Sequence, residues 1–527
     1  MSFSLKKTVS VIVSFVLVIV SVLFFDITVF AEDGTEEPEY ALDSVLVLMD
    51  HEHSAIGTKY ENMNYFQSDL IESVSDIMYL PDDCEDLSLF NVEEFQQVVE
   101  VKLKEPSVEN VDRLIAELSQ YDGVENVDKN YIYKIEEPEI NENPVDNTIA
   151  VTLPSSRSSF ARVPMNADYY VQPEMTTICA LHAWQINIGI PSILVGVADT
   201  GIYFNHPDLV GKGGTGLDKN FTTESTDNDL DGHGTHVAGI IAATANQTTG
   251  FSGVAPGVKL VNLKVATHVK GKPAFNSHCE SAWFYNAVQY ASQNSIRIIN
   301  ASISIDAPSL AQRKYIKNYK GLIVASSGNG GQNTCYYPAK LNYDNIISVA
   351  ASTSNDYLYA SSNYHKKYVD LYAPGVSIKS SVPYFADKSG YKTLDGTSMA
   401  AAFVSGAVAL LWSTKYSSSA TEVKKLLLDN VDKVDRMSDK VLTGGRLNVF
   451  KPIMAGYGWI QGDVDMDGKL TATDARYVQR WASRLETFTD FQFAIGDMNL
   501  DLDLTAEDAR TILRKAANLE NTGDISI

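Results

Sequence analysis

The sequence predicts an α/β protein with a parallel main sheet, a small α+β segment before it and a small helical segment after it. Between residues 168 and 451, short β-branched runs alternate with helical patterns, as in strands joined by crossover helices. Residues 32–137 contain strand-like runs and one amphipathic helix, and residues 462–522 contain a repeated acidic loop. With 527 residues, 45% of them hydrophobic, the chain can form more than one core.

The first 31 residues have the form of an export signal. Two lysines precede an uncharged stretch of seventeen residues (9–25), and a small-x-small sequence ends at Ala31. We therefore expect a secreted, extracellular protein that is not stably inserted in a membrane once the signal is cleaved. A signal retained as an anchor is the alternative.

Residues 32–137 are predicted to form a small acidic domain. Strands are expected at 42–49 and 124–134, and a helix at 107–120. Residues 32–140 contain 29 acidic and 6 basic residues, a net charge of −23, whereas the whole chain carries −24. Such acidity can simply maintain solubility, and the absence of a basic stripe argues against a nucleic-acid partner.

A Pro-, Asn- and Ser-rich linker at 138–167 is predicted to be the processing region. Four cysteines in the whole chain are too few for a disulfide framework, and we expect buried, inert thiols. A second, brief linker is expected at 452–461, because Pro452, Gly456 and Gly458 interrupt it.

The elements of the central domain follow from its hydrophobic runs. Strands are expected at 193–198, 258–265, 296–303, 321–326 and 346–351, and helices at 235–245, 279–293 and 399–413.

Three short motifs place chemically useful side chains at the ends of these elements. Asp199 ends a strand in VGVADTG, His233 opens a helix in DGHGTHVAG, and Ser398 opens another in DGTSMA. A serine hydroxyl becomes a nucleophile when a neutral imidazole takes its proton and a carboxylate holds that imidazole in one tautomer. An Asp-Thr-Gly also occurs in aspartic proteases, but no second such sequence is present. A lone HGTH could instead be a buried or metal-binding histidine.

Taken together and in this order, the motifs resemble the peptidase domain of the subtilisin-like serine proteases, the subtilases. The sequences HPDL at 206–209, GVAP at 253–256 and SSGNG at 326–330 are similar to further family motifs. The resemblance implies a serine endopeptidase acting on polypeptides, with Asp199, His233 and Ser398 as its triad. It also implies an oxyanion hole made by Asn329 and the backbone N–H of Ser398.

The same resemblance implies a substrate-binding strand and one calcium site. The implied substrate-binding residues are Ser302, Ile303, Ser304, Ile305 and Gly328. Family members usually have two glycines where Ser304 and Ile305 stand, so we expect a preference for small P1 residues. Asp208, with Asn246 or Gln247, is a candidate calcium ligand in a loop one residue longer than usual.

The acidic segment at 32–137 resembles the inhibitory prodomain of this family, because YDGVENV at 121–127 is similar to its usual ending. The resemblance implies a ferredoxin-like plug that inhibits the enzyme during export, and therefore a zymogen. An unrelated N-terminal domain is the alternative.

The C-terminal segment contains an internal duplication, GDVDMDGKLTATDARYVQRWASRL at 462–485 and GDMNLDLDLTAEDARTILRKAANL at 496–519. Alternating oxygen donors suit a hard cation such as Ca²⁺. The first loop offers Asp463, Asp465, Asp467, the carbonyl of Lys469, and Asp474; the second offers Asp497, Asn499, Asp501, the carbonyl of Asp503, and Asp508. The turn at position six is normally Gly. It is Gly468 in the first loop and Leu502 in the second, so we expect weaker binding in the second.

This loop-then-helix duplication resembles a type I dockerin, which implies docking to a cohesin module of an extracellular scaffold, as in a cellulosome-like complex. A calcium-stabilised tail without a partner is one alternative. For the whole chain, the alternative to a docked protease is a non-catalytic subtilisin-like binding module that carries a dockerin.

Overall fold

The computed structural model describes residues 40–50, 53–54, 60, 65–78, 97–135, 139–140, 172–244, 251–304, 310–415 and 417–518. The predicted export signal lies outside these residues, as does the predicted linker at 138–167 except for residues 139–140. From Tyr40 onward the chain forms one compact unit.

A nine-stranded, mainly parallel sheet forms the centre of the described chain, in the order β17-β18-β14-β13-β12-β11-β6-β8-β7. Only the edge strand β17 pairs antiparallel, as short edge strands often do in such sheets. The predicted alternation of strands and helices is therefore confirmed. The strands are β6 (Leu194–Asp199), β7 (Lys219–Asn220), β8 (Lys259–Lys264), β11 (Ile298–Ala301), β12 (Leu322–Ser326), β13 (Ile346–Ser352), β14 (Leu371–Pro374), β17 (Asp432–Lys433) and β18 (Gly445–Arg446).

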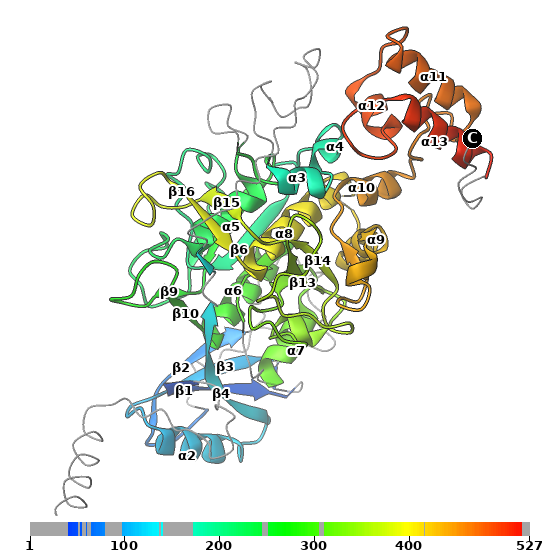
Figure 1. The fold of residues 1–527 in the computed structure, drawn as a ribbon. Helices are drawn as coiled ribbons and strands as arrows, with labels where there is room; N and C mark the ends of the chain where they lie inside the picture. Colours follow the sequence, from blue (N-terminus) through cyan, green and yellow to red (C-terminus); the bar gives the residue numbers. More distant parts are fainter. Residues whose placement is uncertain are drawn as a thin grey trace, which may run out of the picture. The chain divides into compact units, whose positions relative to one another are not determined.

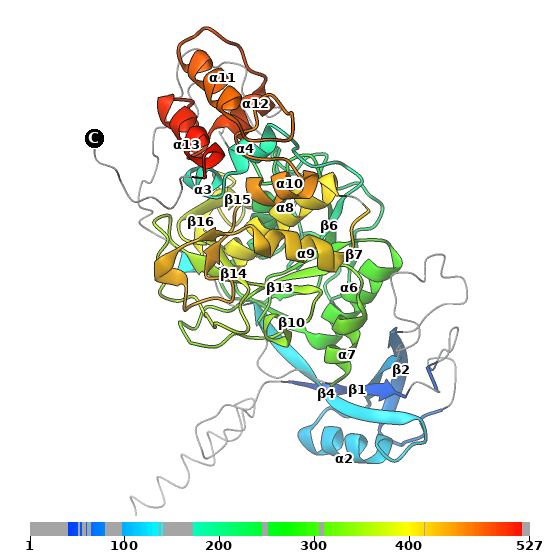
Figure 2. The same cartoon turned by 90° about the vertical axis from the view of Figure 1, so that its right-hand side faces the viewer.

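Helices cover both faces of this sheet, and successive strand residues enter two different cores. In β12, Leu322 and Val324 pack with α5 (His233–Ala242) and α8 (Thr397–Thr414). Ile323 and Ala325 pack on the other face with α6 (Ser281–Gln293) and α7 (Leu310–Asn318). This period of two explains why the strands are continuously hydrophobic. Figure 1 shows α8 in the middle of the molecule, and Figure 2 shows α9 (Ala420–Asp429) and α10 (Phe450–Tyr457) beside it.

The acidic segment forms an antiparallel sheet in the order β2-β3-β1-β4 with one helix, α2, packed on it. Its elements are β1 (Tyr40–Met49), β2 (Ile71–Met78), β3 (Val98–Leu103), α2 (Val108–Leu118) and β4 (Val124–Ile135). The predicted strands and helix are present. Ser107 caps α2, whose Val111, Leu114 and Leu118 are buried against the sheet.

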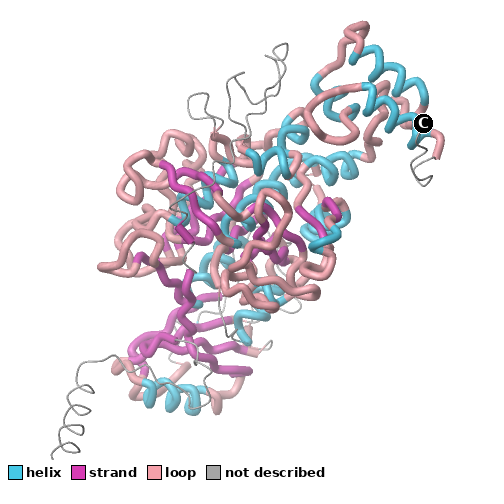
Figure 3. The backbone as a smooth tube through the Cα atoms, in the orientation of Figure 1, coloured by secondary structure: helices cyan, strands magenta, loops and turns pink. Residues whose placement is uncertain are grey.

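This antiparallel sheet continues into the central domain (Figure 3). β4 pairs with β10 (Ser277–Glu280), which in turn pairs with β9 (Thr267–His268). A smaller sheet consists of β15 (Ile378–Ser381), β16 (Tyr391–Asp395) and β5 (Glu139–Ile140). The remaining short elements are α3 (Pro173–Thr177), α4 (Ala180–Trp184), η4 (Ala339–Leu341) and η5 (Asp435–Met437).

The stretch expected to be a linker at 452–461 is mostly helical, because α10 extends to Tyr457. Pro452 lies in the first turn of α10, where its missing N–H breaks no intrahelical hydrogen bond. Gly458 ends the helix at φ 72°, in the left-handed conformation that glycine adopts without strain. Pro452 and Gly458 therefore mark the first turn and the end of a helix.

Three helices follow: α11 (Ala472–Ala482), α12 (Asp490–Gly496) and α13 (Ala506–Ala516). The sequence predicts a helix after each acidic loop, and α11 and α13 begin two residues before Asp474 and Asp508, the last predicted calcium ligand of each loop. The short helix α12 before the second loop is not predicted by the sequence pattern.

Within the described residues, α8 is the one helix long and apolar enough to span a bilayer. Of its 18 residues, 89% are buried inside the protein. The described cysteines, Cys179, Cys279 and Cys335, are free and buried, as predicted.

Candidate active site

Asp199 and His233 meet at the carboxyl edge of the central sheet. Asp199 is the last residue of β6 and His233 the first of α5, and both are fully buried. His233 Nδ1–H donates to Asp199 Oδ1 at 2.8 Å, with Oδ2 at 3.0 Å. His233 Nε2 is also buried and makes no hydrogen bond to the described residues. The ring therefore has one nitrogen fixed by a carboxylate and the other able to accept a proton.

Ser398 lies in the first turn of α8, directly after β16. Gly396 precedes the helix at φ 155°, and Ser398 is 3% exposed. Its carbonyl lies 3.4 Å from Ser302 Oγ, just past the end of β11. Because β6, β11 and β12 are adjacent and parallel, their carboxyl ends meet at one edge. The packing of α5 on α8 completes this arrangement.

Asn329, which follows β12, is bound to the start of α8. Its Oδ1 accepts hydrogen bonds from Thr397 N–H and Thr397 Oγ1–H, both at 2.9 Å. The amide oxygen is thereby fixed against the helix N-terminus, which leaves the Nδ2 hydrogens to point elsewhere. Gly328 is required beside it. Its φ is 103°, and a Cβ there would lie 2.3 Å from Tyr336 Cδ2.

Electrostatics favour a base at His233. Burial lowers the pKa of His233, but the hydrogen-bonded carboxylate of Asp199, together with nearby Asp231 and Asp229, outweighs burial and raises it above its ordinary 6.5. His236, the second histidine of HGTH, behaves differently. Burial lowers its pKa to about 3, and its Nε2 lies 3.0–3.1 Å from the carbonyls of Lys392 and Ile378. His236 is therefore a neutral core residue.

The predicted substrate-binding residues separate by strand alternation. Ile303 is fully buried in the core that contains α6, so its side chain faces away from the site. Ser302 and Ser304, on either side of it, are 1% and 8% exposed. Ile305 lies outside the described residues. Of the two residues expected to narrow the P1 pocket, only Ser304 is therefore placed.

The acidic segment contacts the central domain through β4, which includes Asn130. Asn130 Oδ1 accepts hydrogen bonds from Ser281 Oγ–H at 2.6 Å and from Ala282 N–H at 3.2 Å, at the start of α6. The chain pairs with β10 up to Ile135 and with β16 from Glu139 onward. The chain thus forms one strand pairing before residues 136–138 and another after them, and the sequence does not indicate either pairing.

Acidic side chains converge in the first C-terminal loop. Asp463, Asp465 and Asp467 place carboxylate oxygens within 4.8 Å of one another, the one such group among the described residues. Asp474 is fully buried; its Oδ1 accepts from Asp465 N–H and its Oδ2 from Thr471 N–H. Lys469 N–H donates to Asp467 Oδ1 at 2.8 Å. This donor set fits a calcium ion.

The second loop repeats part of this hydrogen-bond pattern. Asp497 and Asp508 are fully buried, Asn499 Nδ2–H donates to Asp501 Oδ2, and Asp503 N–H donates to Asp501 Oδ1. Asp497 Oδ2 accepts from Leu502 N–H at 2.8 Å and also lies 2.9 Å from His182 Nε2 of α4. The contact with His182 joins residues 315 apart, so no sequence pattern could have revealed it.

Asp208, the candidate calcium ligand of the central domain, is 1% exposed. Its Oδ2 accepts from Tyr391 Oη–H at 2.7 Å and lies 3.4 Å from Ser381 Oγ. Asn246 and Gln247 lie outside the described residues. Hydroxyl groups therefore already satisfy part of this carboxylate.

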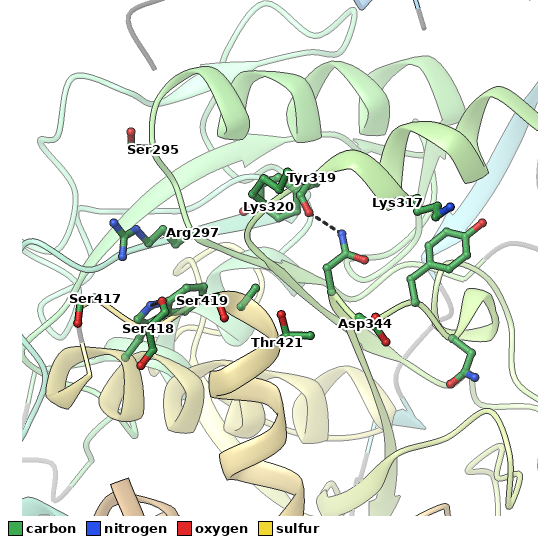
Figure 4. A pocket seen from close by; sticks show the side chains of 15 residues that line it. Ser295, Arg297, Lys317, Tyr319, Lys320, Asp344, Ser417, Ser418, Ser419 and Thr421 are labelled. Atoms are coloured by element: carbon green, nitrogen blue, oxygen red, sulfur yellow. Dashed lines mark hydrogen bonds between the residues drawn. The ribbon is translucent and has the colours of Figure 1, made fainter. Parts of the chain in front are cut away.

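A pocket of about 630 Å³ lies away from all these residues (Figure 4). Arg297, Lys320 and Asn345 line it, and each precedes a strand of the central sheet. The pocket is thus at the amino edge of the sheet, opposite Asp199. It contains none of the predicted site residues.

Comparisons with known proteins match the central domain to a family. Residues 191–446 match the model of the subtilase family. The chain is 37% identical to subtilisin DY of Bacillus licheniformis over 243 residues, 45% of this chain and 82% of that protein. It is 33% identical to thermitase of Thermoactinomyces vulgaris over 279 residues, 52% of this chain and 93% of that protein. Identity to the thermophilic serine proteinase of Bacillus sp. (strain AK1) is 32% over 276 residues, covering 52% of this chain and 64% of that protein.

Proposed function

Because the chain belongs to the subtilase family and is a serine endopeptidase, we propose that Asp199, His233 and Ser398 are the triad with which it cuts polypeptides. The observation that carries this proposal is the His233–Asp199 hydrogen bond, with the opposite ring nitrogen buried and without a hydrogen bond to the described residues.

In the proposed reaction, Ser398 Oγ attacks the carbonyl carbon of the scissile bond while His233 Nε2 takes the hydroxyl proton. The carbonyl oxygen becomes an oxyanion that accepts hydrogen bonds from Asn329 Nδ2–H and the Ser398 backbone N–H. His233 then gives its proton to the leaving amine, and the acyl-enzyme forms. A water molecule, deprotonated by His233, then attacks the acyl-enzyme carbonyl. The ester bond breaks, His233 returns the proton to Ser398 Oγ, and the new carboxyl end is released.

A fluorophosphonate probe tests the nucleophile directly, because it phosphonylates an activated serine. The mature enzyme should be labelled on the peptide that contains Ser398 and not on other serine peptides, and denatured enzyme should not be labelled. Absence of label from enzyme that cuts peptides would contradict the proposal. Absence of both label and cleavage would instead favour a non-catalytic binding module.

We further propose that residues 32–137 are an inhibitory prodomain with a ferredoxin-like fold. The antiparallel sheet and the helix α2 that packs on it, both among the described residues, support this, as does the pairing of β4 with β10. We place the processing bond between Ile135 and Glu139, because the chain pairs with the domain on both sides of this interval and β16 ends only three residues before Ser398.

N-terminal sequencing of the secreted protein tests this placement. The mature chain should begin between residues 136 and 139, at the start of the proposed processing linker (138–167). Further trimming within the linker would yield a second, later N-terminus with time. A first cut beyond residue 150 would contradict the placement.

Finally, we propose that residues 462–522 are a type I dockerin that binds two Ca²⁺ ions and docks the secreted enzyme to a cohesin module of an extracellular scaffold. The two acidic loops, each followed by a helix, support it. Ions would be held by the ten residues named above and would supply a fixed positive charge that holds each loop against its helix. Captured full-length protein should be released from an immobilised cohesin by EDTA. Binding unchanged by EDTA, or no binding to any cohesin tested, would count against docking.

A further inference from the structure

A second histidine–aspartate pair lies next to the first. His268, in β9, has its Nδ1 3.0 Å from Asp231 Oδ2 and its Nε2 3.1 Å from the carbonyl oxygen of Lys272. The Asp231 side chain is fully buried, and the His268 side chain is 20% exposed. Asp231 opens the DGHGTHVAG motif, but nothing in the sequence pairs it with His268.

The two partners of the His268 ring decide how many protons the pair holds. A carbonyl oxygen can only accept, so Nε2 carries a hydrogen. An ionised carboxylate also only accepts, so a second proton must lie between Nδ1 and Asp231 Oδ2 for that contact to be attractive. The pair therefore holds one proton more than a neutral imidazole beside a carboxylate, and its net charge is zero.

Asp231 joins this pair to the proposed catalytic base. It lies two residues before His233, and its Oδ1 is 3.4 Å from the backbone N of His233. Its carbonyl also accepts from the N–H of Phe275 at 3.3 Å. β4 pairs with β10, and β10 pairs with β9, which contains His268. The His268–Asp231 contact therefore connects this sheet to the first turn of α5.

Other charged groups surround the pair, and most are already satisfied. Asp229 accepts five hydrogen bonds, from Thr200, Asp231, Gly232 and, twice, Thr235. Glu224 Oε1 accepts from the backbone N–H of His268, and its Oε2 pairs with buried Lys264 at 2.9 Å. The charged groups around the pair are thus Glu224 and Asp229 from the segment between β7 and α5, His233 from α5 and Lys264 from β8. Burial, and repulsion by Asp229, raise the pKa of Asp231 to about 6.

We propose that His268 and Asp231 are a positioning pair for His233: their shared proton keeps the charge beside the catalytic imidazole at zero while the contact holds the first turn of α5. This inference rests on the proposed role of His233. Without His268, Asp231 loses its compensating partner, and at a pH above its own pKa it is an uncompensated buried anion. A second anion beside His233 favours the imidazolium, so more of the base is protonated at a given pH.

The pH dependence of kcat/KM, measured from pH 5 to 10 on mature enzyme with active sites counted by fluorophosphonate, tests the inference. His268→Gln should raise the midpoint pH of the acid limb of kcat/KM by roughly half a pH unit to one pH unit. Asp231→Asn should not raise it, and the double variant should return it to the wild-type position. Asp429→Asn, which removes an exposed charge on α9, is the matched control and should change nothing.

A merely structural pair would behave differently. Both single variants would then lose activity equally at every pH, and the double variant would not restore the limb. That result, or an unshifted limb in active His268→Gln, would overturn the proposal. Should His268→Gln fail to fold, Asp231→Asn alone decides, because an upward shift in that variant contradicts charge compensation. If His233→Ala retained full activity, the proposed triad would fail instead.

Discussion

His233 Nδ1 lies 2.8 Å from Asp199 Oδ1, although 34 residues separate the two in the chain. The parallel sheet produces this contact, because β6 delivers Asp199 to the edge where α5 begins. The same edge receives Ser302 from β11 and Asn329 from β12. Site residues that are far apart in the sequence thus lie close together because they follow or end adjacent parallel strands.

The first prediction concerns the acid limb of activity. The pKa of His233 is raised, and only the neutral ring can act as base, so activity should fall as the pH drops through a value above 6.5. Asp199→Asn should lower kcat by about 10⁴, because the imidazole loses the partner that fixes its tautomer. Steady-state kinetics across pH check both statements. A wild-type acid limb below pH 6 would contradict the first, and near-normal kcat in Asp199→Asn the second.

Asn329→Ala should lower kcat by about 10² to 10³ with little change in KM, since the lost donor acts on the oxyanion and not on the bound substrate. Single-substrate kinetics measure this split. Gln332→Ala, three residues later in the same loop, provides a comparison in which kcat should be preserved. A loss expressed mainly in KM would assign Asn329 to ground-state binding.

Much of this site could be predicted because the sequence around each motif also indicates the strand end or helix start at which the motif lies. A strand ending on Asp199 and helices opening on His233 and Ser398 are visible as hydrophobic periods beside short polar motifs. The buried neutral state of His236 could not be predicted, because it depends on carbonyls from β15 and β16 more than 140 residues away. The His268–Asp231 and His182–Asp497 contacts, between residues 37 and 315 apart, also escaped prediction, because each forms only in the folded chain.

Two local interpretations show the limits of residue preferences. Pro452 and Gly458 suggest a linker in the sequence, yet their positions match the start and end of α10. Leu502 at position six is expected to be strained, and its φ is indeed 69°. Its side chain, however, is 9% exposed and packs into the main core, which offsets part of that strain. The burial of Leu502 depends on contacts that the loop sequence does not contain.

The interface between the acidic segment and the central domain should weaken as pH rises. Burial, followed by repulsion from Asp43 and Glu100, raises the pKa of Glu280 to about 7. Release of the segment removes both neighbours, so the pKa of Glu280 returns towards 4.5. The complex therefore favours protonated Glu280: its stabilisation is complete below about pH 4.5 and is lost as pH rises through 7.

Dissociation of the processed, non-covalent complex checks this at pH 5 and pH 8. Release should be faster at pH 8, by up to about a hundredfold, and Glu280→Gln should remove most of the difference. Glu109→Gln, on an exposed position of α2, should leave the difference intact. Equal pH dependence in wild type and Glu280→Gln would show that another group controls release.

Gly468→Ala should weaken calcium binding in the first C-terminal loop. Gly468 has φ 82°, and a methyl group added to its Cα would meet no atom within 4 Å, so the substitution costs backbone strain without a steric clash. A strain of about 1–2 kcal/mol corresponds to roughly 5- to 30-fold in affinity. Calorimetry on full-length Ser398→Ala should show two affinities that converge when Gly468→Ala is added. Lys469→Ala, which keeps its carbonyl, is the control; two equal sites before any substitution would contradict the prediction.

The most direct measurement is peptide cleavage by Ser398→Ala compared with wild type and with Ser413→Ala, a serine near the other end of the same helix α8. We predict a fall in kcat of about 10⁶ for Ser398→Ala, with the acidic segment still covalently attached, and near-normal activity and maturation for Ser413→Ala. Ser398→Ala protein that cuts peptides at a wild-type rate, or that matures with no other protease present, would contradict the account.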